Sequence, residues 1–358
     1  MKSFCFSVFI LSSVSLFGFT VYQNPRDNTA QLQTQLDSIT AENALGEKGM
    51  VAAPAWPITK APSYMLSVDV LYWKTLVGGT SFVATNTTTS TGLPISGFVK
   101  NEALDWNFGI KASVGKILKH DVWGLFAEWT YYTTHGSSKA AAGITSTLTP
   151  LRGSYAESVQ RASSQMKMFF TSLDVSLCRY YFISAYLAMQ PLLGIKNTWN
   201  KLQQDITYSL GENLLTNLAT TCDLSKMWGI GPNIGLNTSW YLGKDFSITG
   251  LFCASTLYSY IRSFETSLVS AHPELSLQLS DKQHLFLPNL QWRLGLGWNR
   301  YFCQKTRRLD INLAYEALYY FRLNQMLFLT KFQNTFRTQN ISEDVSLYGV
   351  SLKLLYSF

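Results

Sequence analysis

The feature that most constrains this chain is a two-residue alternation of apolar and polar side chains that recurs from about Tyr64 to Phe358. Within residues 289–299, for example, Asn, Gln, Arg and Gly occupy the odd positions, and Leu and Trp occupy the even ones. Because successive side chains of a strand point to opposite faces, the pattern predicts strands with one apolar and one polar face. We count ten such strands, near residues 64–74, 105–115, 123–131, 172–177, 189–196, 228–240, 246–261, 289–299, 309–316 and 348–358.

The connections between these strands alternate between short and long. Short ones fall near residues 117–121, 179–182, 242–245 and 303–308. Long ones, of about 25 residues, fall near residues 75–103, 135–163, 200–224, 263–285 and 322–344. Outer-membrane barrels combine short periplasmic turns with long extracellular loops, so the sequence predicts an all-β fold, a transmembrane antiparallel up-and-down barrel with both termini in the periplasm. Weak alternation in residues 143–151, 205–210 and 275–279 leaves room for further hairpins, and 12–16 strands as the upper range.

A soluble β-sandwich also alternates, so composition is needed to separate the two folds. Charged residues make up only 14% of the chain, against about 25% in ordinary soluble domains. Aromatic residues also make up 14%, and Trp and Tyr gather near the strand ends, while the mean hydropathy is only +0.04. A barrel wall with a lipid face and a polar lumen explains all of these values.

The first residues differ from the barrel. Residues 1–20 are interpreted as a signal peptide, since Lys2 precedes the apolar stretch Phe4–Phe19, with cleavage between Gly18 and Asn24. An uncleaved membrane anchor is the alternative. After this stretch no run of about 18 apolar residues occurs, so no transmembrane helix is expected.

Two segments separate the signal peptide from the barrel of residues 64–358. Residues 28–46 form a short helical, coiled-coil-like segment with apolar residues at heptad spacing, namely Leu32, Leu36 and Ile39. A periplasmic oligomerisation helix and a frayed periplasmic tail are both compatible with so short a seam. Residues 47–63 contain several prolines and are predicted to be an extended linker.

The C-terminus carries a pattern for barrel assembly. Apolar residues alternate up to a terminal aromatic residue, through Tyr348, Val350, Leu352, Leu354, Tyr356 and Phe358. The assembly machinery of Gram-negative outer membranes recognises this kind of terminal strand. The expected partners are therefore this machinery and the surrounding outer-membrane lipid and lipopolysaccharide. The net charge of +7 is scattered without runs of like sign, which argues against nucleic-acid binding.

No catalytic or metal-binding motif is found. The four histidines fall in predicted turns or loops, at His120, His135, His272 and His284, and no G-x-S-x-G or H-E-x-x-H occurs. "GIGPNIG" lies inside an alternating strand, where its glycines serve lumen packing or close strand approach rather than phosphate binding. After signal cleavage four cysteines remain, without CxxC spacing, so zinc is not expected and their disulfide state stays open, at Cys178, Cys222, Cys253 and Cys303. We expect no enzymatic activity and no cofactor.

The stretches "LDWNFGIKASVGKILKHDVWGLFAEWTYY", "MQPLLGIKNTW" and "WGIGPNIGLNTSWYLGKDFSITG" resemble the Legionella major outer membrane protein family, with related porin-like proteins in chlamydia-like bacteria. The resemblance runs from about Leu71 to Phe358. It implies an outer-membrane porin or surface antigen, often a homo-oligomer such as a trimer, and in some members attachment to the host-cell surface.

The charged residues on the polar faces are the candidates for a pore lining. They are Asp69, Asp105, Lys111, Glu128, Asp174, Lys196, Arg293, Asp310, Glu316 and Lys353. In a barrel of ten strands we expect such side chains to fill the lumen, whereas 14 or more strands enclose water. The function predicted from the sequence is a general diffusion channel for small hydrophilic solutes. The alternative is a non-conducting surface adhesin or structural barrel.

Overall fold

The computed structural model describes the chain from Tyr64 onward with short gaps: residues 64–86, 97–118, 123–143, 147–153, 159–184, 186–209, 218–243, 245–270, 276–302, 307–332 and 335–358. The segments assigned above to a signal peptide, a short helix and a proline-rich linker lie outside these residues. Among the residues described, no helix is long and apolar enough to cross a membrane.

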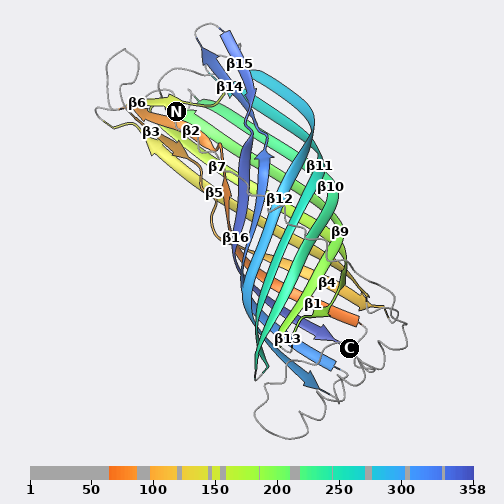
Figure 1. Ribbon diagram of the computed structural model, residues 1–358. Helices are drawn as coiled ribbons and strands as arrows, with labels where there is room; N and C mark the ends of the chain where they lie inside the picture. Colours follow the sequence, from red (N-terminus) through yellow and green to blue (C-terminus); the bar gives the residue numbers. More distant parts are fainter. Residues whose placement is uncertain are drawn as a thin grey trace, which may run out of the picture. The chain divides into compact units, whose positions relative to one another are not determined.

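Ten antiparallel strands form a closed barrel, as the ten-strand count predicted (Figure 1). They are β1 (Tyr64–Val77), β4 (Asn107–Ile117), β5 (Trp123–Ala141), β7 (Arg161–Arg179), β9 (Leu187–Ser209), β10 (Leu218–Gly243), β11 (Phe246–Val269), β12 (Leu277–Phe302), β13 (Arg307–Asn324) and β16 (Glu343–Ser357). Each pairs with the next of these ten in the sequence, and β1 pairs with β16 to close the sheet. The higher range of 12–16 barrel strands is therefore wrong.

The closing seam joins the start of β1 to the end of the chain. The backbone N–H groups of Tyr64 and Phe358 each donate to the other residue's carbonyl, at 2.9 Å. Their rings stack with centroids 6.0 Å apart. The alternating residues from Val350 of β16 to the following Phe358 are exposed on the outer face, where lipid contacts the wall.

Deleting Phe358 is expected to lower the yield of folded barrel in the outer membrane. The deletion removes both closing hydrogen bonds and the terminal aromatic ring that we propose as the recognition element for the assembly machinery. The measurement is the heat-modifiable fraction on gels of outer-membrane extracts, with Phe358→Tyr as a control that keeps an aromatic terminus. A deletion variant that folds and accumulates like the unaltered protein would contradict the proposed role.

Six short strands lie outside the ten. They are β2 (Ser81–Asn86), β3 (Gly97–Asn101), β6 (Thr147–Pro150), β8 (Tyr181–Phe182), β14 (Leu327–Phe332) and β15 (Thr335–Asn340). β2, β3 and β6 form one small sheet, and β14 with β15 forms a hairpin. Both lie at the end of the barrel opposite the closing Tyr64–Phe358 pair (Figure 1). Of the three weakly alternating stretches, one contains β6, and the other two are continuations of barrel strands β9 and β12.

Two of the predicted long loops are mostly strand. β9 continues to Ser209 and β10 starts at Leu218, and β11 and β12 likewise leave only residues 270–276 between them. The loop prediction is wrong there because the apolar face of each strand changes from the outside to the inside of the barrel. On β9, Leu193, Ile195 and Trp199 face outward, but beyond them the apolar side chains face inward, as at Leu202, Ile206 and Tyr208.

The change of side marks the upper boundary of the lipid-facing band. Below it the outer surface is apolar, and on β10 this band runs from Trp240 to Trp228. Above it the outer surface becomes polar and the interior apolar, as in a protein surrounded by water. β10 has 26 residues; at about 3.3 Å per residue and a tilt of about 40° it rises roughly 65 Å. An apolar band of about 25 Å accounts for less than half of that height. The remainder forms an extracellular extension of the barrel.

Candidate functional site: the barrel lumen

The charged side chains predicted to line a pore gather in the middle of the lumen, where they pair with one another. Lys111 of β4 lies with its Nζ 2.7 Å from an oxygen of Glu316 on β13 and 3.5 Å from an oxygen of Glu128 on β5. Lys111 and Glu316 are only 2% and 0% exposed. The Gln291 side chain of β12 donates a further 2.7 Å hydrogen bond to Glu316. The pairing neutralises charges that would otherwise be costly to hold out of water.

Two more ion pairs extend this lumenal ion cluster. Lys196 on β9 lies 3.1 Å from Asp174 on β7, and it also donates to Gln291 at 3.3 Å. Arg293 on β12 lies 3.6 Å from Asp69 on β1. The cluster thus joins strands on opposite sides of the barrel, which alternation along single strands could not reveal.

The remaining three predicted positions differ from one another. Lys353 lines the lumen on β16, directly opposite Asp69 of the cluster. Asp310 lies nearer the periplasmic end, where Arg308 donates to it at 2.8 Å. Asp105 precedes β4 and is exposed, with its backbone bound to His135 and Thr134. The structure therefore does not place Asp105 with the lumenal charges.

Above the ion cluster, toward the extracellular end, apolar side chains fill the lumen. Every barrel strand except β4 contributes to them, and Leu104 and Met326 come from the connections. Together they form one contiguous cluster, termed the apolar plug: Leu71, Trp73, Leu104, Tyr132, Met166, Met168, Phe170, Leu202, Met227, Leu257, Ile261, Leu287, Leu318, Tyr320, Leu323, Met326, Val345 and Leu347. Trp73 packs on Tyr132 with ring centroids 5.6 Å apart, and Phe170 meets Tyr320 at 5.8 Å. The Tyr132 hydroxyl donates to the Trp73 carbonyl at 2.8 Å.

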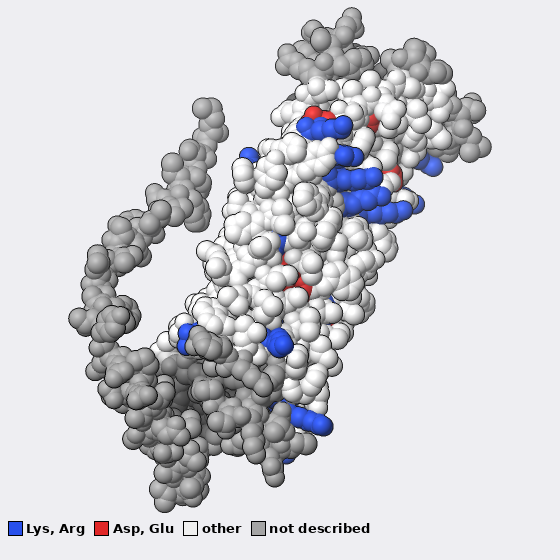
Figure 2. All heavy atoms as spheres, turned by 90° about the vertical axis from the view of Figure 1, so that its right-hand side faces the viewer, with Lys and Arg blue, Asp and Glu red and all other residues white. Residues whose placement is uncertain are grey.

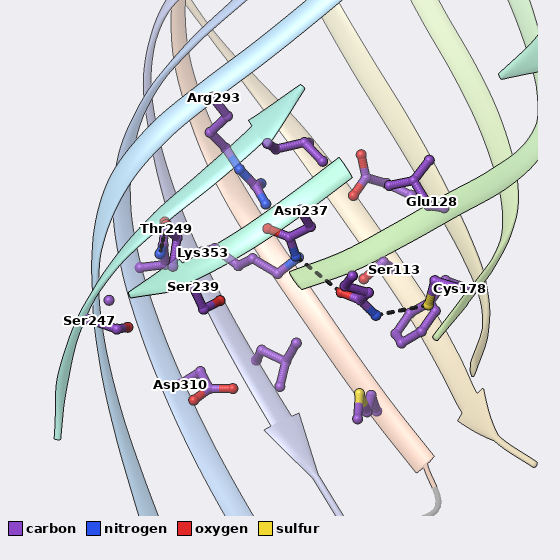
Figure 3. A pocket seen from close by; sticks show the side chains of 18 of the residues that line it. Ser113, Glu128, Cys178, Asn237, Ser239, Ser247, Thr249, Arg293, Asp310 and Lys353 are labelled. Carbon is purple, nitrogen blue, oxygen red and sulfur yellow. Dashed lines mark hydrogen bonds between the residues drawn. The ribbon is translucent and has the colours of Figure 1, made fainter. Parts of the chain in front are cut away.

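Below the ion cluster, toward the periplasmic end, the lumen contains a cavity of about 220 Å³. Its wall carries polar groups from many strands, among them Asn237 and Ser239 of β10 and Thr249 of β11 (Figure 3). Glu128 and Arg293 lie at one end of it and Asp310 toward the other (Figure 3). From the periplasmic end upward, the lumen is thus a polar cavity, then an ion-paired layer, then the apolar plug.

A further buried charge closes the extracellular end, and sequence reasoning missed it. Arg152, which follows β6, is almost fully buried and lies 3.1 Å from Asp223 of β10. It also donates to the backbone carbonyls of Ser81, at 3.0 Å, and of Gly79. Arg152 lay in a predicted loop, where a single arginine gives no sign that it will turn inward. The contacts hold this segment across the barrel mouth.

Two buried acidic groups near Arg152 have raised pKa values. Burial raises the pKa of Asp223 to about 7, although Arg152 opposes the shift. Burial, and then the charge of Asp223, raises the pKa of Glu265 to about 8. Both Glu265 carboxyl oxygens are buried without a hydrogen-bond partner among the residues described, as suits a protonated group.

We expect the extension to open more readily at pH 8.5 than at pH 5.5. A carboxyl whose pKa is raised by folding favours the folded state while it is protonated. That stability is lost as the pH rises from about 4, the ordinary pKa of a glutamate, to about 8, the pKa of Glu265 in the folded protein. Hydrogen exchange in the upper parts of β10 and β11, corrected for the intrinsic exchange rate, measures the opening. Glu265→Gln should reduce the pH difference, and an unchanged difference would exclude Glu265 as its source.

The histidines and cysteines that the structure describes do not gather into one site. His135 and His284, predicted in loops, lie instead on β5 and β12 with exposed side chains, and His284 faces lipid-side aromatic rings. Three of the cysteines, Cys178, Cys222 and Cys253, are unpaired, and Cys303 lies outside the residues described. Within the described part of the chain, no three His, Cys, Asp or Glu side chains are grouped so as to hold a metal ion.

A closed antiparallel barrel with an apolar outer band, a polar inner wall and short turns at one end defines an integral outer-membrane protein. The sequence matches the Legionella pneumophila major outer membrane protein precursor family over residues 56–358, and the chain belongs to that family. It is therefore a protein of the Gram-negative outer membrane, as predicted. No curated protein matches the sequence closely.

Solved structures similar to this chain include three outer-membrane proteins. The outer membrane protease OmpT from Escherichia coli is 10% identical, with a TM-score of 0.45 over 85% of this chain and 99% of that one. The translocator domain of the autotransporter NalP from Neisseria meningitidis is 10% identical, with a TM-score of 0.33 over 93% and 98%. A major outer membrane protein from Thermus thermophilus is 8% identical, with a TM-score of 0.31 over 83% and 100%.

Proposed function

We propose that this protein is a closed, non-enzymatic outer-membrane barrel that displays its extracellular extension at the cell surface, rather than an open diffusion pore. The observation that carries the proposal is the apolar plug. Trp73, Tyr132 and Phe170 are fully buried in it, and close-packed apolar interiors exclude water. An ion or a sugar would have to leave its hydration shell to cross this layer.

The state of the lumenal charges supports the same function. Selectivity in a pore depends on charged groups that face the passing solute. Here Lys111, Lys196 and Arg293 each lie within 4 Å of a carboxylate. Their fields offset each other, and their hydrogen bonds tie opposite walls together. Such a network favours a rigid wall over a conduction path.

The amount of chain outside the membrane indicates where the function lies. The extension includes the upper parts of β7, β9, β10, β11 and β12, the β2–β3–β6 sheet and the β14–β15 hairpin. The extension has its own apolar cluster, in which Phe82 and Leu148 of the small sheet pack with Tyr208 of β9. A surface structure of this size and order suits an adhesive or structural role.

Side-selective thiol labelling tests the proposal. In a variant whose native cysteines are all serine, Ser239→Cys places a thiol in the periplasmic cavity, and Ser280→Cys places one on the exposed outer face of the extension. A charged thiosulfonate is added to intact cells of a host without general porins. We expect it to label Ser280→Cys at once, and Ser239→Cys only after the outer membrane is permeabilised. Equal labelling of both in intact cells would contradict a closed lumen.

A general diffusion pore is the second candidate function. The polar cavity favours it, because serine, threonine and asparagine side chains line a path of the kind that small hydrophilic solutes use. Conduction would require the apolar plug and the Arg152 contact with Asp223 to move aside. The labelling experiment separates the two functions, since a pore that opens in the membrane exposes Ser239→Cys to the outside.

A further inference from the structure

A row of four basic residues crosses four adjacent strands on the outer face of the barrel. Lys226 of β10 lies directly opposite Lys201 of β9 on one side and Arg262 of β11 on the other. Arg262 in turn lies opposite Lys282 of β12. All four side chains are exposed. Figure 2 shows basic side chains gathered in such a run near one end of this face.

The position of this basic row relative to the membrane is defined by the row beneath it. On each of the four strands, the outer residue that lies two positions closer to the periplasm belongs to this lower row. These residues are directly opposed across the strands: Trp199, Trp228, Tyr260 and His284. Trp and Tyr in such a belt lie at the membrane interface. Because the closing Tyr64–Phe358 pair is at the other end, this belt is the extracellular one. The basic row therefore lies at the height of the lipid headgroups of the outer leaflet.

Nothing among the described residues neutralises the row. Side chains directly opposite in antiparallel strands have Cβ atoms about 5 Å apart, and like charges at that spacing destabilise the sheet. No acidic side chain forms an ion pair with any of the four in the described part of the chain. The nearest acid on the outer face, Asp205, lies two rows further out and accepts hydrogen bonds from Gln203 instead. Within residues 186–209, 218–243, 245–270 and 276–302, which hold these four strands, no acid compensates this repulsion, and an anion from outside the chain would relieve it.

Arg262 is held ready for such an anion. Its Nε donates to the Tyr260 hydroxyl at 2.9 Å, and its guanidinium lies 5.0 Å from the centre of the Tyr260 ring. This contact uses Nε, and the two terminal nitrogens have no hydrogen-bond partner among the residues described. A guanidinium so fixed binds a phosphate through two parallel hydrogen bonds, while lysines on either side add charge.

We propose that the row formed by Lys201, Lys226, Arg262 and Lys282 binds the phosphate groups of an anionic glycolipid in the outer leaflet. The aromatic belt contacts the lipid's acyl and sugar regions, and the cations contact its phosphates. A lipid presents several phosphates at this height on one molecule or on neighbouring ones, which matches a row of cations better than a single pocket. The inference rests on the outer-membrane location and not on whether the lumen is closed.

A pair of double variants with equal charge change tests the assignment. Lys226→Gln with Arg262→Gln removes the centre of the row. Lys116→Gln with Arg300→Gln is the control, because these exposed cations lie on the outer face at the periplasmic end, beside Tyr64 and Phe302. Folded protein in detergent is titrated with purified lipopolysaccharide. We expect the first variant to bind at least about tenfold more weakly than the unaltered protein, and the control to bind like it.

Three further arms identify the ligand. Enzymatically dephosphorylated lipopolysaccharide should bind the unaltered protein about as weakly as intact lipid binds the first variant. Inorganic phosphate at the lipid's concentration should not displace the lipid, and displacement would show a free-phosphate site instead. Each of three outcomes would overturn the proposal. The two double variants could bind the lipid equally, or the unaltered protein could bind dephosphorylated and intact lipid equally. The unaltered protein could also bind a sulfated polysaccharide tightly but not the lipid. Heat-modifiable mobility confirms that each variant is folded, and Lys226→Gln alone should give a smaller loss.

Discussion

Replacing Lys111 by methionine is expected to destabilise the barrel by about 3–5 kcal/mol. Lys111 is 2% exposed, and its Nζ lies 2.7 Å from Glu316, which is fully buried. Methionine fills a similar volume but leaves Glu316 charged without its cation, and Glu128 loses the same partner. The cost is that of an uncompensated charge held away from water. Urea unfolding of the protein in lipid vesicles, followed by tryptophan fluorescence, measures the free energy.

The double variant Lys111→Met with Glu316→Gln serves as the matched comparison. Glutamine keeps the hydrogen bond with Gln291 but carries no charge, so much of the lost stability should return. If the double variant is as unstable as the single one, the two residues do not act as a pair. If Lys111→Met alone costs less than about 1 kcal/mol, the lumen is wet enough to screen the charges, as at an exposed surface.

Trp292→Arg is expected to destabilise the barrel by about 2–4 kcal/mol. Trp292 lies near the middle of the lipid-facing part of β12, is 45% exposed on the outer face, and packs against Tyr315 with ring centroids 5.6 Å apart. An arginine there must reach out of the hydrocarbon or deform the bilayer. The same unfolding assay in vesicles gives the free-energy difference.

Gln278→Arg is the control for this substitution. Gln278 lies on the same outer face of β12, but it is exposed beyond the basic row and therefore outside the lipid. It should change stability by less than about 0.5 kcal/mol. Equal costs at both positions would mean that the register of β12 or the membrane boundary is wrong.

The sequence predicted the barrel because lipid and lumen impose opposite demands on alternate residues. Tyr64 was expected to begin the barrel, and β1 begins there. The upper parts of β9 and β10 were missed since the apolar face changes from the outside to the inside between Trp199 and Leu202. A switch of the apolar residues from one face of the alternation to the other is a sequence signal that predicts longer strands here. The same switch marks the membrane surface.

The lumen could be predicted only as a set of polar faces. Alternation places Glu316 and Lys111 inside, but they come from β13 and β4, and their contact depends on how far the strands are staggered around the barrel. The apolar plug was hidden for a similar reason, because Leu71 and Trp73 continue the inward face of Asp69 with no break in the pattern. The prediction that Asp105 lines the lumen is wrong because β4 starts two positions after it.

Conductance across a planar lipid bilayer tests most directly whether the apolar plug closes the lumen. Purified, folded protein is inserted into one bilayer, and a general diffusion porin in a second bilayer serves as the control. Protease protection in vesicles of the same composition verifies insertion. We expect no stepwise current from the protein in 1 M salt, while the porin conducts. Regular, stable conductance steps from the unaltered protein would contradict the closed lumen and favour a diffusion channel.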